Sequence, residues 1–206
     1  MVCFSYLATA ELWTVPRFPL ANFGPEVVSI ERSIAADAPM TAAVLAALGV
    51  PTLLLGNDIG AHQKGAEVLA WLRRQGVDFT ARAKTGTATP RITVVADGHG
   101  TRTWFPYLPG VTDSLAALDL SLLEMASFAY IDCYQLIDAP AARAVGAVQA
   151  AGIPLLLNLG GSSLSAAVVA ALRGCQRLIV QTGVDEAAFA DAPQVAALIL
   201  AATRAT

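Results

Sequence analysis

The amino-acid sequence predicts an α/β fold in which helices cover both faces of a mostly parallel sheet. Residues 46–79 carry the clearest signal, because a helix end, a buried strand, a polar turn and an amphipathic helix follow one another there. Gly49 suits the left-handed residue that ends a helix, and Pro51 can open a strand but cannot continue a helix. The same Gly-x-Pro punctuation recurs at residues 152–154. Strands and helices that alternate in this way imply parallel pairing through right-handed crossovers.

The elements follow in order from apolar runs and their breakers. Short apolar runs between turn residues predict strands at residues 2–7, 52–55, 128–132, 154–158 and 178–180. Helices are expected at residues 37–48, 60–75, 115–126, 139–151, 165–172, 185–190 and 194–202. Asp37 is interpreted as an N-cap, while Gly76 and Gly152 close two of the helices.

Two segments differ from the rest of the chain in composition and do not show its alternation of helix and strand patterns. Residues 12–34 are interrupted by prolines and glycine, and residues 91–105 hold two β-rich runs around Asp97-Gly98-His99-Gly100, which is a turn composition typical of a hairpin. We expect these segments to pair as a small separate sheet. The predicted organisation is an α/β core of residues 1–11, 35–90 and 106–206, with the small sheet formed by 12–34 and 91–105.

Composition excludes several classes of protein. The 206 residues are 55% hydrophobic and 14% charged, with a mean hydropathy of +0.57. The uncharged stretch 38–56 is nevertheless broken by Pro39, Gly49 and Pro51, so no membrane span is predicted, and the absence of a signal-peptide pattern favours a cytoplasmic location. The net charge of −3 without a basic stripe argues against nucleic acid. Three widely spaced cysteines define neither a disulfide framework nor a zinc site, and no metal site or catalytic triad is predicted.

Four ordered landmarks resemble the ribokinase family, also called the PfkB carbohydrate kinases. They are the stretches 56–60 (Gly-Asn-Asp-Ile-Gly), 72–78 (Leu-Arg-Arg-Gln-Gly-Val-Asp), 89–92 (Thr-Pro-Arg-Ile) and 97–102 (Asp-Gly-His-Gly-Thr-Arg). The resemblance implies a three-layer α/β sandwich whose small sheet is a β lid that closes over a sugar or a nucleoside. It also implies a homodimer through the lid, and ATP with Mg²⁺ as the phosphate donor.

Site residues carried over by this resemblance depart from the family pattern at several positions. Glu11 matches a substrate-reading Asp, Ala35-Ala36 match paired glycines, and Met40 matches a substrate-binding Asn. The family's Asn-x-x-Glu element, associated with Mg²⁺ and phosphate, is matched by residues 183–186, in which only Glu186 is kept. The substrate-binding candidates are Glu11, Asp37, Met40 and Trp104, and the phosphate-associated candidates are Asn158 and Glu186.

Structural roles compete with these assignments. Asp37 could serve only as a helix cap, Trp104 only as lid packing, Asn158 only as a turn residue, and Glu186 only as an acidic residue in a first helical turn. The substrate cannot be named from the sequence.

The family's Gly-Ala-Gly-Asp element, which supplies a catalytic Asp and an anion hole, does not occur in the sequence. We therefore expect no catalytic residue here and no phosphate transfer by this polypeptide alone. The alternatives are a non-catalytic small-molecule-binding or dimerisation module, a natural short form, or a shortened gene product.

Overall fold

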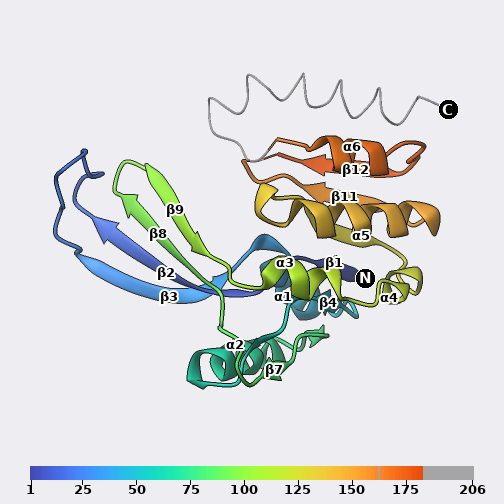
Figure 1. Cartoon of the computed structure of the whole chain (residues 1–206), viewed down its shortest axis with the longest axis horizontal. Helices are drawn as coiled ribbons and strands as arrows, with labels where there is room; N and C mark the ends of the chain where they lie inside the picture. The colour runs from blue at the N-terminus through green and yellow to red at the C-terminus, as the bar shows by residue number, and fades with distance from the viewer. Residues whose placement is uncertain (162, 183–206) are drawn as a thin grey trace.

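The computed structural model describes residues 1–161 and 163–182, and its centre is a six-stranded sheet in which every pairing is parallel (Figure 1). The strand order is β12-β11-β10-β1-β4-β6. The strands are β1 (Val2–Phe4), β4 (Leu53–Leu55), β6 (Asp78–Phe79), β10 (Ala129–Asp132), β11 (Leu155–Asn158) and β12 (Leu178–Gln181). The predicted α/β fold class is confirmed.

Helices cover both faces of this sheet. They are α1 (Asp37–Ala47), α2 (Gln63–Arg74), α3 (Val111–Ala116), α4 (Ser121–Glu124), α5 (Asp138–Ala150) and α6 (Ala166–Ala171), with a 3-10 turn η1 (Gln135–Ile137) before α5. Alternate side chains of the strands divide the apolar interior into two clusters. Val2 and Phe4 pack with α3, α5 and α6, whereas Cys3 packs with α1 and α2. The result is a three-layer sandwich.

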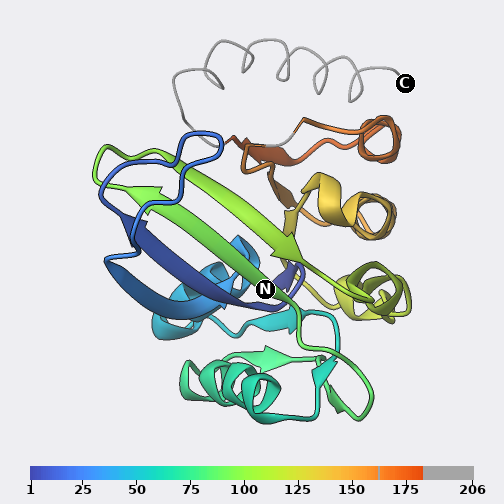
Figure 2. The same ribbon diagram turned by 60° about the vertical axis from the view of Figure 1, so that its left-hand side comes forward.

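A second, four-stranded sheet projects from the core in the order β3-β2-β8-β9 (Figure 2). Its strands are β2 (Ala8–Val15), β3 (Ser29–Ala35), β8 (Arg91–Asp97) and β9 (Arg102–Tyr107). The predicted hairpin is present as the antiparallel β8–β9 pair, and the two segments pair through parallel β2 and β8. We call these four strands the small sheet. Only three residues separate the end of β1 from Ala8, where β2 begins, so the chain passes almost directly from the core into the small sheet.

Several local predictions are corrected by the structure. The helix predicted at residues 115–126 is two short helices, α3 and α4, because Asp119 accepts a hydrogen bond from the backbone of Ser121 and turns the chain between them. The helix predicted from residue 60 begins at Gln63, since Ile59–Gly60 form β5, which pairs with β7 (Ala83–Lys84). The N-cap of α1 is Ala36 and no side chain caps it, so the interpretation of Asp37 as the N-cap is wrong.

The glycines that end three of the helices were predicted correctly. Gly49, Gly76 and Gly152 follow α1, α2 and α5 with φ of 77°, 70° and 66°, the left-handed conformation that ends a helix. The helices predicted at 185–190 and 194–202 lie outside the described residues. Within the described ranges, no helix has the length and apolarity that a membrane crossing requires.

Candidate functional site

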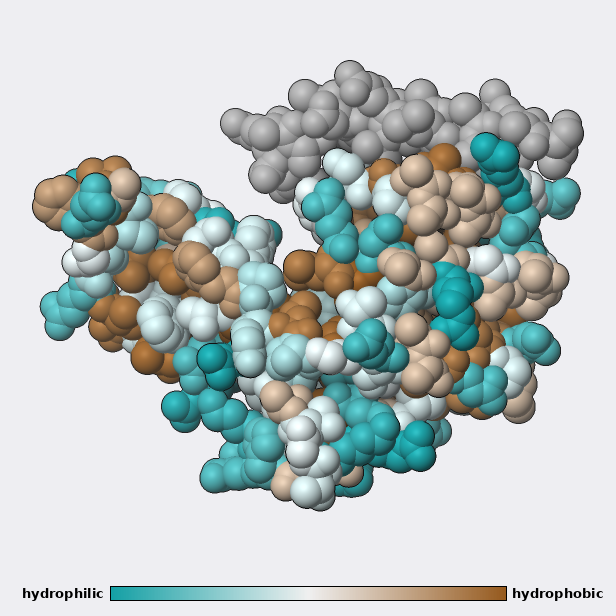
Figure 3. All heavy atoms as spheres, viewed as in Figure 1, coloured by the Kyte–Doolittle hydropathy of each residue, from teal (hydrophilic) through white to brown (hydrophobic). Residues whose placement is uncertain are grey.

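Polar side chains gather where the carboxyl ends of β10 and β11 meet the first turn of α1. Asp132 ends β10, Tyr134 follows it, Asn158 ends β11, and Asp37 opens α1. We call these four residues the polar cluster. The carboxyl ends of parallel strands are the usual position of ligand sites in open α/β sheets, because helices begin there and backbone and side-chain groups are left available. In Figure 1 these strand ends point toward the small sheet, and Figure 3 shows a notch with apolar residues between the two parts.

Hydrogen bonds connect all four members of the polar cluster. The Tyr134 hydroxyl donates to Asp37 Oδ2 over 2.6 Å, and Asn158 Nδ2 lies 2.7 Å from the same oxygen. Asn158 Nδ2 also lies 2.8 Å from Asp132 Oδ1, so one amide joins the two carboxylates. The remaining oxygen of Asp132 accepts the backbone N–H of Ala38 over 2.9 Å. The Asp132 side chain therefore holds the beginning of α1, which the local sequence leaves without its own cap.

Burial divides the cluster into a floor and an open edge. Asp132 and Asn158 are 0% and 1% exposed, whereas Asp37 is exposed and Tyr134 is half-buried. Burial raises the pKa of Asp132 to about 6, and the neighbouring Asp37 charge adds to this, although hydrogen bonds from Asn158 and the Ala38 amide oppose it. Burial and the nearby carboxylates likewise raise the pKa of Tyr134, so its hydroxyl stays a donor. Among the described residues, no ion pair involves either carboxylate.

Two further residues shape the floor. Ser5, directly after β1, is fully buried and close enough to Asp132 to lower its pKa, yet its Oγ has no partner that satisfies hydrogen-bond geometry among the described residues. Gly160, which donates to Asn158 Oδ1, has φ of 53°, and a Cβ there would lie 2.8 Å from the Tyr134 ring. The absence of a side chain at Gly160 therefore leaves room for Tyr134, whose ring packs 5.9 Å from that of Tyr6.

The structure brings together only part of the predicted site. Asp37 and Asn158 meet in the polar cluster, as described above. Glu11 does not join them: it accepts a hydrogen bond from Trp13 and pairs with Arg32 at 3.4 Å, on the face of the small sheet opposite to Ala10, which packs toward the core. Met40 packs among apolar residues of the α1–α2 layer. Glu186 lies outside the described residues.

Trp104 lies on the small sheet and is 54% exposed, with the Arg102 guanidinium 5.2 Å from its ring centre. Its cross-strand neighbour Val94 packs against the core cluster, so Trp104 is on the face of the small sheet that leads toward the core.

Asp132 and Tyr134 were not predicted as site residues. The sequence did offer a signal for Asp132, which stands at the carboxyl end of a predicted buried strand. Burying a carboxylate costs free energy unless hydrogen-bond or charged partners surround it, so such a residue points to a polar site.

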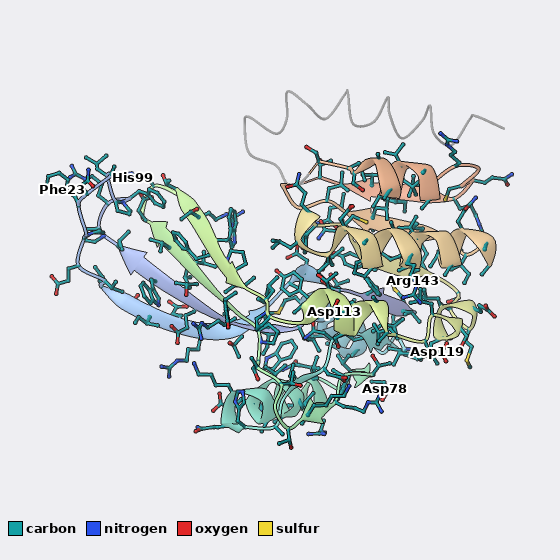
Figure 4. The ribbon with its side chains drawn as sticks, viewed as in Figure 1. Phe23, Asp78, His99, Asp113, Asp119 and Arg143 are labelled. Atoms are coloured by element: carbon teal, nitrogen blue, oxygen red, sulfur yellow. The ribbon has the colours of Figure 1, made fainter. Side chains whose placement is uncertain are left out.

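A pocket of about 690 Å³ lies elsewhere, between the β5–β7 region and the α3–α4 segment. Asp58 at its wall is paired with Lys84 and Arg82, so these charges are already compensated. The opposite wall includes Asp113 and Asp119, which Figure 4 labels along the α3–α4 segment. The lining of this pocket includes the ion-paired Asp58, Arg82 and Lys84 and none of the hydrogen-bonded residues of the polar cluster, so the polar cluster is the better candidate site.

Solved structures of sugar kinases share this fold. The chain superposes on a ribokinase from Giardia lamblia with a TM-score of 0.66 and 15% identity, over 87% of this chain and 61% of that one. An Arabidopsis thaliana ribokinase complexed with ribose and ATP gives 0.64 and 15%, over 96% and 68%. A Halothermothrix orenii fructokinase gives 0.65 and 15%, over 76% and 56%. No protein-family model and no curated protein sequence matches significantly. The chain thus has a ribokinase-like fold and spans about two thirds or less of these three proteins.

Proposed function

We propose that this chain is the substrate-binding part of a ribokinase-like kinase, and that it binds a sugar or a nucleoside at the polar cluster. The observation that carries the proposal is the state of Asp37: Tyr134 and Asn158 hold one carboxylate oxygen, and the other has no partner among the described residues. A fixed carboxylate with a free oxygen is a strong acceptor for the hydroxyl groups of a polyol. The shared fold with ribokinases, one of them bound to ribose and ATP, supports the same reading.

The small sheet supplies the proposed cover for the ligand. Trp104, on the face that leads toward the core, is a candidate contact from above, and its amphipathic ring can pack on the apolar side of a sugar. Met40 and Glu11 remain proposals from the resemblance, with Met40 lining an apolar layer and Glu11 paired to Arg32. We keep the proposed division into a core of 1–11, 35–90 and 106–206 and a lid of 12–34 and 91–105.

ATP and Mg²⁺ enter the proposal from the resemblance alone. The described residues offer no group of three or more His, Cys, Asp or Glu side chains placed to hold a metal ion, and Glu186 lies outside them. The sequence contains no Gly-Ala-Gly-Asp element. We therefore propose that this polypeptide, assayed by itself, binds its substrate without transferring phosphate.

Isothermal titration with a panel of sugars and nucleosides tests the proposal. At least one neutral member should bind, and Asp37→Asn should weaken that binding several-fold. Asp78→Asn is the matched control. Asp78, labelled in Figure 4, is exposed and pairs with Leu53 at the amino end of the edge strand β6, whereas the polar cluster lies at the carboxyl ends of the strands. Failure of the whole panel to bind would refute the proposed function. ATP turnover by the purified chain would refute the proposed inactivity.

A second candidate function, dimerisation through the small sheet, rests on its exposed apolar side chains. Ile30, Phe105 and Tyr107 are 52%, 60% and 52% exposed. The strand register places all three on the same face, opposite to Trp104. Light scattering should give the mass of a dimer for the wild type and that of a monomer for Phe105→Asp. A wild-type monomer at all concentrations tested would rule this candidate out.

A further inference from the structure

The polar cluster contains two carboxylates that form no ion pair within the described part of the chain. Asp37 and Asp132 are joined by one neutral amide, that of Asn158. The described cations that form ion pairs do so elsewhere: Arg32 with Glu11, and Arg82 and Lys84 with Asp58. A ligand at the cluster itself therefore meets carboxylate oxygens and the Tyr134 ring, whereas the small sheet proposed to cover it carries Arg102 beside Trp104.

The geometry of Asp37 defines what the ligand must offer. Both protein donors go to its Oδ2, and its Oδ1 has no partner among the described residues, on an exposed side chain at the edge of the cluster. A hydroxyl can donate one hydrogen bond to that oxygen. An ammonium group can donate as well and adds opposite charge, which makes the hydrogen bond shorter and stronger.

A buried unpaired hydroxyl is an independent sign that the network is incomplete. Ser5 Oγ is fully buried beside Asp132 and has no partner of acceptable geometry among the described residues. Buried polar groups are rarely left unpaired, and at a functional site an additional donor or a bound water usually completes the set. This hydroxyl therefore lies beside one of the two carboxylates of the polar cluster, that of Asp132.

We propose that the polar cluster prefers sugar- or nucleoside-like ligands that carry a primary ammonium group over their neutral counterparts, and that it rejects carboxylated or phosphorylated ones. The inference rests on the proposed function, because it places the ligand at the same cluster. The positive group pairs with Asp37 Oδ1, and Tyr134 and Asn158 hold that carboxylate in place. An anionic ligand would add a third negative charge beside two carboxylates that form no ion pair among the described residues, where partial burial weakens screening.

Matched ligand triads test this preference. Glucose, glucosamine and glucuronate form one triad, galactose, galactosamine and galacturonate a second, and adenosine, 3′-amino-3′-deoxyadenosine and adenosine 5′-monophosphate a third. Titrated at pH 7 into the full chain, the amine should bind about tenfold more tightly than the neutral member, the step expected when a charged donor replaces a neutral one. The acid or phosphate should show no binding.

Variants assign the preference to Asp37. In Asp37→Asn, the amine and the neutral ligand should bind with affinities within a few-fold of each other, so most of the amine's advantage is lost. In Asp78→Asn, the amine should still bind about tenfold more tightly than the neutral ligand. Tyr134→Phe removes one hydrogen-bond donor from Asp37 Oδ2 but leaves the Asp37 charge in place. This variant should still bind the amine more tightly than the neutral ligand, and the neutral ligand more tightly than the acid or phosphate. Thermal unfolding checks that each variant is folded.

The outcomes separate the two proposals. Equal binding of neutral and amine members, tight binding of an acid, or an equal loss of the ratio in Asp78→Asn would overturn the charge preference while leaving the proposed function in place. Absence of binding by every member of every triad would overturn both.

Discussion

Replacing Ala36 by glycine should stabilise the protein, although glycine usually destabilises. Ala36 has φ of 81° and ψ of 153°, a region that is almost confined to glycine because a Cβ collides with the neighbouring backbone. The residue joins β3 of the small sheet to α1 of the core. It also stands at one of the two positions where the ribokinase family resemblance places paired glycines.

The expected gain follows from opposing terms. An L-residue held in this region costs about 1–3 kcal/mol, which glycine relieves. Glycine adds about 0.5–1 kcal/mol of unfolded-chain entropy, and the half-buried Ala36 methyl is lost. The net expectation is a gain of about 1 kcal/mol, or a rise of about 2–4 °C in Tm for a chain of this length.

Urea and thermal unfolding of Ala36→Gly measure this gain, with Ala35→Gly as the matched control. Ala35 is buried, ends β3 and is not among the residues with positive φ, so its replacement should cost about 1 kcal/mol. An unchanged m-value would show that the same surface unfolds in each variant. If Ala36→Gly destabilised the chain as much as Ala35→Gly does, the argument from backbone strain would be refuted.

Three further predictions concern the polar cluster and one helix end. The folded-state pKa of Asp132 is raised to about 6, so the folded chain keeps this proton to a higher pH than the unfolded chain does. The stability that the proton contributes is present below about pH 4 and is lost as the pH rises to about 6. The free energy of unfolding of the wild type minus that of Asp132→Asn, measured with urea, should therefore fall with pH in that window and stay constant above pH 7. Gly160→Ala should cost about 2 kcal/mol or more in urea unfolding and displace Tyr134, seen as a changed tyrosine fluorescence or NMR signal, and unaltered spectra would contradict the close contact. Ser165→Ala should cost about 1 kcal/mol, because the Ser165 hydroxyl accepts the backbone N–H of Val168, and Ser165→Asp, which keeps an acceptor, should retain most of that stability.

The core elements could be predicted because their signals are local. Short apolar runs placed the five longer core strands within three residues of their observed limits, and glycines with positive φ marked the ends of α1, α2 and α5. The two-residue strands β5, β6 and β7 are too short for any periodicity to show. The break between α3 and α4 was hidden because Leu115-Ala116-Ala117-Leu118 continues a helical pattern up to Asp119.

The site was harder to predict because it depends on register and on contacts between distant residues. Glu11 illustrates the first limit: a shift of one residue along β2 exchanges the two faces of the small sheet, and the sequence does not fix that register. Asp37 illustrates the second. Its first-turn position suggested a cap, but its partners Tyr134 and Asn158 are 97 and 121 residues away, so only the folded chain reveals them.

The residue that joins the small sheet to the core, Ala36, is directly followed by residues that the polar cluster holds in place. A strained residue keeps its conformation only where neighbouring contacts fix it. Here Ala36 is followed at once by Asp37, held by Tyr134 and Asn158, and by Ala38, whose N–H is held by Asp132. A ligand bound to Asp37 would therefore act on the residue next to the point where β3 enters the core. Such a ligand could change the position of the small sheet only if its affinity differed between one position of that sheet and another.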